Sequence, residues 1–139
     1  MLAKLLAEIE RQGGYVHGVG AEPVVDLELC FDGNDDPGSI GSNLIDHPGP
    51  AHLYAVLRSI RDRPDVHGVW IGISEVMAPD EWPFSDHVYV VSTAQAAEVT
   101  KWAAALQSHE PGGVWWNRVP PARPIAIAPD ARLVTVWWD

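Results

Sequence analysis

The chain has 139 residues, 47% of them hydrophobic and 20% charged, and its 19 acids against 9 lysines and arginines give a formal net charge of −10 at pH 7. These values are typical of one globular domain, which we expect to span residues 1–139, and no apolar run approaches the roughly 20 residues that cross a bilayer. The negative charge disfavours binding to nucleic acid, whose phosphates attract lysine and arginine.

The first predicted element is a helix that ends at Gly13-Gly14. Its apolar residues recur at i, i+3, i+4 and i+7, the spacing of one helix face; they are Leu2, Leu5, Leu6 and Ile9. Charged residues interrupt these apolar positions and no small-residue cleavage pattern follows, which is not the pattern of a signal peptide. We therefore expect a cytoplasmic protein without membrane association.

Two strands are predicted before the next loop. Residues 15–20, YVHGVG, form a short one. Residues 23–31, PVVDLELCF, alternate apolar and polar side chains, which is typical of a half-buried strand; its core-facing residues would be Val25, Leu27, Leu29 and Phe31. The single cysteine, Cys30, cannot form an internal disulfide, and we expect it to be a small buried residue of this strand.

A second helix is predicted to begin at Pro50 and to end before Pro64. Residues 66–77 and 86–92 are predicted strands, and the short connection between them favours an antiparallel pair. Ser92 and Gln95 match a capping box before a third helix, which ends at residues 110–113. Residues 113–117 and 132–139 are the last predicted strands. This order predicts a two-layer α+β fold with a mainly antiparallel sheet and about three helices packed on one face.

The segment FDGNDDPGSIGSN, residues 31–43, is the first candidate site. Asp32, Asn34 and Asp36 alternate as the first ligands of an EF-hand calcium loop do. Position six, which must be glycine, is Pro37, and position twelve is Asn43 instead of glutamate. The acids and the absence of lysine and arginine from the segment also disfavour a phosphate-binding loop.

Histidines supply an alternative hypothesis, a small enzyme or metal-dependent module built around residues 32–52. Its residues would be Asp32, Asn34, Asp35, Asp36, Asp46, His47 and His52. None of the histidines has the spacing of a zinc hydrolase motif. Asp86 and His87 form another acid and histidine pair, but neighbouring side chains of a strand point to opposite faces, so we expect them not to contact each other.

The seven tryptophans favour a different function, binding to another protein. Tryptophan is a preferred anchor of protein interfaces, and acids around it would attract a basic partner. Tandem pairs such as Trp115-Trp116 put one ring on each face of a strand. The predicted partner-binding residues are Asp32, Asp35, Asp36, Glu81, Trp82, Asp86 and Trp138. We expect no catalytic residue and no cofactor, and a homodimer formed through the edge strand RLVTVWWD is a further hypothesis.

Four segments carry a resemblance to known proteins: FDGNDDPGSIGSNL with HPGP, VLRSIRDRPDV, EWPFSDHVYVVSTA and the final WWD. With them the chain resembles a family of small acidic bacterial proteins known mostly as uncharacterised. In size, acidity and tryptophan content it is also similar to immunity proteins of bacterial polymorphic toxin systems, including the SUKH-type group. That second resemblance implies a non-enzymatic inhibitor whose partner is a basic toxin or effector.

Overall fold

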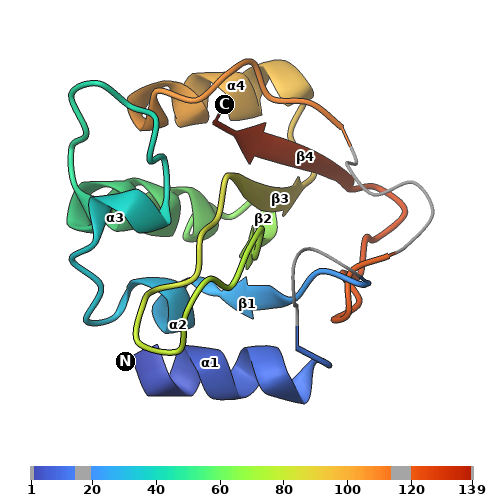
Figure 1. Cartoon of the computed structure of the whole chain (residues 1–139). Helices are drawn as coiled ribbons and strands as arrows, with labels where there is room; N and C mark the ends of the chain where they lie inside the picture. Colours follow the sequence, from blue (N-terminus) through green and yellow to red (C-terminus); the bar gives the residue numbers. More distant parts are fainter. Residues whose placement is uncertain (1, 15–19, 114–119, 139) are drawn as a thin grey trace.

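A computed structural model describes residues 2–14, 20–113 and 120–138 (Figure 1). Its sheet has the order β1-β2-β3-β4, formed by β1 (Val24–Asp26), β2 (Val66–Gly72), β3 (His87–Ser92) and β4 (Arg132–Trp137). Each neighbouring pair is antiparallel. Strands that are neighbours along the chain are therefore also neighbours in the sheet.

The helices of the described residues pack on one face of this sheet. They are α1 (Leu2–Arg11), α2 (Leu27–Phe31), α3 (Pro50–Arg61) and α4 (Ala96–Ala103), with short 3-10 turns η1 (Pro37–Ser39) and η2 (Ala104–Leu106). In Figure 1, α3 lies to the left of the strands, with α1 below and α4 above, and the orange-red segment 120–131 lies to the right. The predicted α+β fold with an antiparallel sheet is confirmed, with one short helix more than expected.

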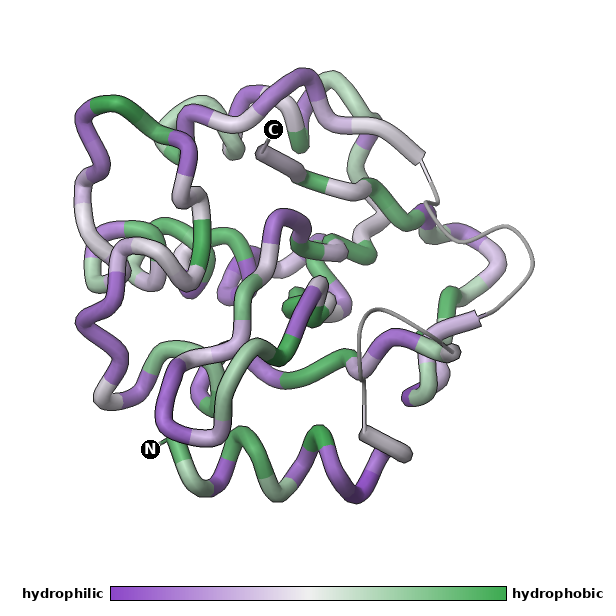
Figure 2. The backbone as a smooth tube through the Cα atoms, viewed as in Figure 1, coloured by the Kyte–Doolittle hydropathy of each residue, from purple (hydrophilic) through white to green (hydrophobic). Residues whose placement is uncertain are grey.

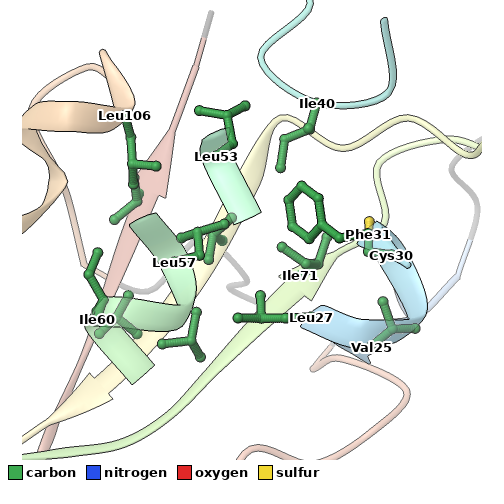
Figure 3. Packing of buried hydrophobic residues seen from close by; sticks show 14 of the residues in the cluster. Val25, Leu27, Cys30, Phe31, Ile40, Leu53, Leu57, Ile60, Ile71 and Leu106 are labelled. Carbon is green, nitrogen blue, oxygen red and sulfur yellow. The ribbon is translucent and has the colours of Figure 1, made fainter. Parts of the chain in front are cut away.

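One row of side chains crosses the inner face of the sheet. Val25, Ile71, Val88 and Val136 are paired in register from β1 to β4, and all four are fully buried. The helices add their own apolar residues to the same core. Figure 3 shows side chains of α2 and α3, among them Leu27, Phe31 and Leu57, around Ile71. Burial of this shared core against both layers is the main stabilising contribution to the fold.

The outer face of the sheet is covered by a loop. Ile125 and Ala131 pack against a small cluster that includes Trp70, Tyr89 and Leu133. The amide of Ala122 also donates to the carbonyl of Glu22, at 2.9 Å, which joins the loop to the segment before β1. The sheet therefore has apolar contacts on both faces, although its helices lie on one.

Two local predictions are wrong. Residues 23–31 were expected to form one strand, but β1 ends at Asp26 and Leu27–Phe31 is helical. Leu27, Cys30 and Phe31 are the buried residues of α2, and their spacing of i, i+3 and i+4 is that of a helix face. Tertiary packing thus favours the helical pattern over the alternating pattern that the same residues also contain.

The expected capping box is wrong as well. Ser92 is the last residue of β3, paired with Val66 and Arg132, and its buried Oγ has no hydrogen-bond partner within the described parts of the chain. Gln95 is itself the N-cap of α4. The strands predicted at residues 15–20 and 113–117, with His17, Trp115 and Trp116, lie largely or wholly outside the described residues.

Both sheet edges carry additional hydrogen bonds. The amide side chain of Gln12 donates to the carbonyl of Val24 and accepts from its N–H, each at 2.9 Å, so that it continues the sheet beside β1. At the other edge, Gly112 and Thr135 exchange two backbone hydrogen bonds, and His109 donates to the carbonyl of Trp137. The edge strand proposed for a homodimer is therefore already hydrogen-bonded at Thr135 and Trp137.

In the parts of the chain that the structure describes, no helix has the length and apolar character needed to span a membrane.

Candidate functional site

The most unusual group of polar side chains surrounds His87, the first residue of β3. Its Nδ1 lies 2.6 Å from Oδ1 of Asp86, and its Nε2 lies 2.7 Å from Oε2 of Glu22. The side chain of His87 is only 5% exposed. The imidazole is therefore held between two carboxylates at the end of the sheet.

The contact between Asp86 and His87 corrects the expectation that these neighbours point apart. That expectation required both residues to be extended within one strand, but β3 begins only at His87. Ser74 fixes the orientation of Asp86, because its Oγ accepts from the amide of Asp86 at 3.1 Å and donates to Oδ1 of Asp86 at 2.8 Å. The carboxylate of Asp86 is thereby turned toward the imidazole.

Tyr89 completes the group from the same face of β3. Its hydroxyl donates to Oε1 of Glu22, so both oxygens of that carboxylate are hydrogen-bonded. The rings of His87 and Tyr89 meet edge to face, with centroids 5.2 Å apart. The cluster thus joins three segments, since Glu22 precedes β1, Ser74 follows β2 and the other members lie at the start of β3.

The two carboxylates determine the charge of the imidazole. Burial alone would lower the pKa of His87, but hydrogen bonds to Asp86 and Glu22 and the charges of both carboxylates outweigh it and raise this pKa to about 9. Burial also tends to raise the pKa of Asp86, yet its hydrogen bonds from His87 and Ser74 hold that pKa below its ordinary value. At neutral pH the cluster therefore contains an imidazolium and an ionised Asp86.

This protonation state decides what the cluster can do chemically. A general base must be able to accept a proton near the working pH, and a protonated His87 cannot accept one. Ser74 donates its own proton to Asp86 rather than to a free imidazole nitrogen, so it lacks the activation of a catalytic nucleophile. The cluster is suited to hold Asp86 in one place as a negative charge.

Asp86 reaches the surface at a small hollow, which we call the Asp86 hollow. Its volume is about 130 Å³, and it is lined by Gly41, Ser42, Asn43, Phe84, Asp86 and Trp138. Its two walls are joined by backbone contacts, because the amide of Ser85 donates to the carbonyl of Ser39 at 2.8 Å and Ile40 pairs with Ser85. Side-chain contacts of Asp86 to Ser74 and His87 use only Oδ1.

A second hollow, the Asp46 hollow, shares Asn43 and Trp138 with the Asp86 hollow. It has a volume of about 360 Å³ and is lined by Asn43, Leu44, Ile45, Asp46, Gln107, His109 and Trp138. Ile45 on its rim is 98% exposed. Figure 2 shows the loop between α2 and α3, which carries both hollows, mostly in purple and white and broken by short green stretches. An apolar side chain thus projects from an acidic loop.

The predicted acidic residues of this loop have different local roles. Asp32 accepts from the hydroxyl of Tyr54 at 3.2 Å, and Asp36 caps η1 by accepting from the amide of Gly38 at 2.8 Å. Asn34 is buried, and its amide donates to the carbonyl of Cys30 and to Oγ of Ser39. Asp35 is exposed. Of the alternating residues that suggested calcium ligands, Asn34 and Asp36 thus hydrogen-bond within the loop, and Asp32 bonds the loop to α3.

The histidines of the alternative hypothesis are also separated. His47 lies between two backbone groups, with Nδ1 accepting from the amide of Gly49 at 2.8 Å and Nε2 lying 2.7 Å from the carbonyl of Ile40. His52 is exposed on α3. Among the described residues there is no group of three or more histidines, cysteines and acids placed to hold a metal ion.

Of the two tryptophans predicted as partner anchors, Trp138 is buried and Trp82 is partly exposed. Trp138 is 3% exposed, and its Nε1 donates to the carbonyl of Leu106 at 2.9 Å, so it is part of the core and the floor of both hollows instead of a projecting anchor. Trp82 is half-buried against the core, beside the exposed Glu81. Ile45 is the most exposed of the large apolar residues that the structure describes, followed by Met77 and Ile127, and none of the three was predicted from the sequence as an anchor.

Glu22, Ser74 and Tyr89 were missed as well. Glu22 is 65 residues from His87 in the sequence, and no short motif connects the two. The only available signal was the Asp86-His87 pair, which is a common dipeptide without specificity of its own. The antiparallel register of β2 and β3 is what brings Ser74 beside it.

Comparison with known proteins agrees with the first resemblance. A family model described as the uncharacterized protein YfbO family matches residues 1–136. The chain belongs to this family. It is 32% identical over 119 residues to the uncharacterized protein YfbO of Escherichia coli (strain K12), an alignment that covers 84% of this chain and 83% of that relative. No solved structure matches the chain. The family and the α+β fold are thus shown, and the family brings no activity with it.

Proposed function

We propose that this protein is a non-enzymatic binding module that holds a basic protein partner on its acidic loop, residues 32–46, and on Asp86. The most concrete form of the proposal is an immunity-type inhibitor of a toxin or effector in the cytoplasm. The observation that carries it is the position of Asp86, an ionised carboxylate held by a buried imidazolium and open to a surface hollow.

The distribution of charge supports this proposal. Most basic residues of the described chain contact acids or rings of the same chain: Arg11 with Glu8, Arg61 with Glu28, Lys101 with Glu98, Arg123 with Asp26, and Arg58 over the ring of Tyr54. Acids such as Asp35, Asp46 and Glu81 form no ion pair within the described ranges. Their charge is therefore available to attract a positively charged surface.

An exposed apolar residue supports it as well. A fully exposed isoleucine loses contact with water only when another molecule covers it, and burying such a side chain contributes about 1.5–3 kcal/mol. Ile45 lies next to Asp46, and both residues line the Asp46 hollow. An apolar contact beside a carboxylate is consistent with the apolar centre and polar rim of protein interfaces.

The alternative of an enzyme or metal module around residues 32–52 draws no support from the geometry, because Asn34, Asp36 and His47 hydrogen-bond within their own loop. The imidazolium of His87 likewise has no free nitrogen to take a proton. Protein binding needs neither group to react, and it uses the loop in the conformation that these hydrogen bonds stabilise.

The test begins with a tagged chain used to recover a partner from its native host, followed by association kinetics with the purified partner. We expect the association rate constant to fall steeply as salt is added. The double variant Asp35→Asn/Asp46→Asn should slow association several-fold. The control Glu10→Gln/Asp130→Asn makes the same change in net charge at other exposed acids and should have a smaller effect. Equal effects of both variants, or a rate independent of salt, would contradict the proposal.

A further inference from the structure

We propose that the Asp86 hollow binds the guanidinium group of one arginine side chain supplied by the partner. This inference rests on the proposed function, because it names the group of the basic partner that the acidic surface recognises.

The volume of the Asp86 hollow suits the end of one side chain better than a whole small molecule. Sites for whole small molecules usually measure about 300–1,000 Å³, whereas the Asp86 hollow measures about 130 Å³. A water molecule occupies about 30 Å³ of liquid volume, so the hollow has room for a group equivalent to a few waters. It is suited to the end of one side chain that enters from an opposing protein surface.

The charge of the hollow selects a cation. Among the described residues that line it, Asp86 is charged and none is a lysine, arginine or histidine. No described residue donates a hydrogen bond to Oδ2 of Asp86, while Oδ1 is occupied by Ser74 and His87. One carboxylate oxygen is thus fixed by the protein and the other is left to accept from a ligand.

The remaining lining favours guanidinium over ammonium. Besides Asp86, the residues that line the hollow include Asn43 and Ser42, which carry an amide and a hydroxyl, and the aromatic residues Phe84 and Trp138. A guanidinium is planar, donates in several fixed directions and packs against aromatic rings, whereas an ammonium is compact and strongly hydrated. A mixed wall of separate acceptors and aromatic carbon therefore fits arginine better than lysine.

The walls are also fixed before a ligand arrives. Asp86 is restrained by Ser74 and His87, and residues 41–43 follow directly on Ile40, which pairs with Ser85. A site whose groups are already in place loses little conformational entropy on binding. The same contacts prevent Asp86 from turning away to an alternative partner on its own surface.

The first experiment titrates the ¹⁵N-labelled full chain with N-acetyl-argininamide and follows backbone amide shifts. N-acetyl-lysinamide replaces the guanidinium with an ammonium and so tests the preference for arginine over lysine. N-acetyl-citrullinamide has nearly the shape of the arginine probe but no charge, and so tests whether binding requires the positive charge. We expect saturable shifts at Ser42, Asn43 and Asp86 with the arginine probe, at concentrations on the order of millimolar. The lysine probe should bind several-fold more weakly, and the citrulline probe should give no saturable shift. Equal responses to arginine and citrulline, or no saturation with arginine, would overturn the inference.

Two variants test the location of the binding. Asp86→Asn removes the charge, and Ser42→Trp fills the hollow while leaving Asp86, Ser74 and His87 unchanged. Both should abolish the saturable shifts. The control Ser59→Trp places the same side chain at an exposed serine on α3 and should leave them intact. If Asp86→Asn fails to fold, Ser42→Trp still decides, because shifts that persist in this folded variant would place the arginine elsewhere.

The same variants separate this inference from the proposed function. If the partner associates with a steep salt dependence but Ser42→Trp binds it as the wild type does, the arginine site is wrong and the binding function stands. If the arginine probe occupies the hollow but the charge variants do not alter partner association, the acidic-surface function fails while the hollow remains a guanidinium site.

Discussion

The imidazole of His87 lies directly against the backbone of Gly72, its cross-strand neighbour in the pair β2 and β3. A Cβ atom placed on Gly72 would be 2.2 Å from Nε2 and 2.6 Å from Cδ2 of that ring. Real Cβ contacts do not reach such distances, and the ring cannot move aside without leaving Glu22 and Asp86. The cluster around His87 can therefore form only because residue 72 is a glycine.

We first predict that Gly72→Ala destabilises the protein. Forcing an extra carbon into a packed site costs about 1–3 kcal/mol, and here the hydrogen bonds of His87 are lost as well. Urea unfolding followed by tryptophan fluorescence measures the free energy of unfolding. Gly113→Ala is the matched control, because a Cβ on Gly113 meets no atom within 4 Å. If both variants are equally stable, the described contact between Gly72 and His87 is wrong.

A second prediction concerns pH. Because the pKa of His87 is about 9 in the folded protein and about 6.5 when unfolded, its protonated form stabilises the fold. This contribution is fully present below pH 6.5 and is lost as pH rises through 9; the shift corresponds to about 3 kcal/mol at most. Among the described residues, the polar groups that face the ring are the carboxylates of Glu22 and Asp86 and the hydroxyl of Ser74, with the hydroxyl of Tyr89 bound to Glu22. Urea unfolding at pH 6.5, 8 and 9.5 should show the decline.

The comparison for this prediction is His87→Gln, in which the decline between pH 6.5 and 9.5 should be much smaller. His52→Gln removes an exposed histidine and should retain the wild-type profile. Parallel pH profiles for the wild type and His87→Gln would show that the imidazolium is not the stabilising species.

A third prediction addresses the edge of β1. Gln12→Ala removes both hydrogen bonds to Val24 and leaves its N–H and carbonyl without a side-chain partner, at a cost of about 1–3 kcal/mol. An uncovered strand edge also pairs readily with another chain. Light scattering over a range of concentrations should therefore detect more association than in the wild type. Glu10→Ala, at an exposed position of α1, should change neither the stability nor the association.

The fourth prediction distinguishes two tryptophans. Trp138→Phe leaves the carbonyl of Leu106 without its hydrogen bond and opens space in the core, so we expect a loss of about 2–4 kcal/mol. Trp82→Phe alters a half-buried ring and should cost less. Urea unfolding of the two variants shows which substitution lowers the free energy of unfolding more. A larger loss for Trp82→Phe would mean that Trp138 is not the core residue.

The fifth prediction concerns the thiol of Cys30. Burial raises the pKa of this thiol to about 12, and the reactive species is the thiolate. A thiol-specific reagent such as dithionitrobenzoate should therefore modify the native protein at the rate of unfolding, and the urea-unfolded protein at once. Rapid modification under native conditions would show that α2 opens without global unfolding.

Much of the architecture follows from local patterns. The apolar stripe of α1 and the glycines after it, Pro50 at the first turn of α3, and the alternation within β2 and β3 each have one dominant interpretation. Residues 27–31 do not, because they fit an alternating pattern and a helical face equally well. The contact of α2 with α3, for example the stacking of Phe31 on Tyr54, depends on residues distant in sequence.

The candidate site could be predicted only in part. Asp86 and the acidic loop stand out by composition, but the group that fixes Asp86 comes from three segments brought together by the sheet. The burial of Trp138 could not be predicted either. In the pair Trp137-Trp138 either ring could face the core, and only the register of β4 shows which one does. The pairing of strands that are distant in sequence therefore determines both the partners of Asp86 and the burial of Trp138.

The backbone contact between Ser39 and Ser85 has a mechanical consequence. It joins the acidic loop to Ser85, which lies two residues before His87 at the start of β3. A displacement of the loop is therefore transmitted to β3 through this hydrogen bond. Docking a partner on the loop should therefore slow the exchange of β3 amide hydrogens with solvent. Binding at the surface loop would thus change the stability of hydrogen bonds in the buried sheet.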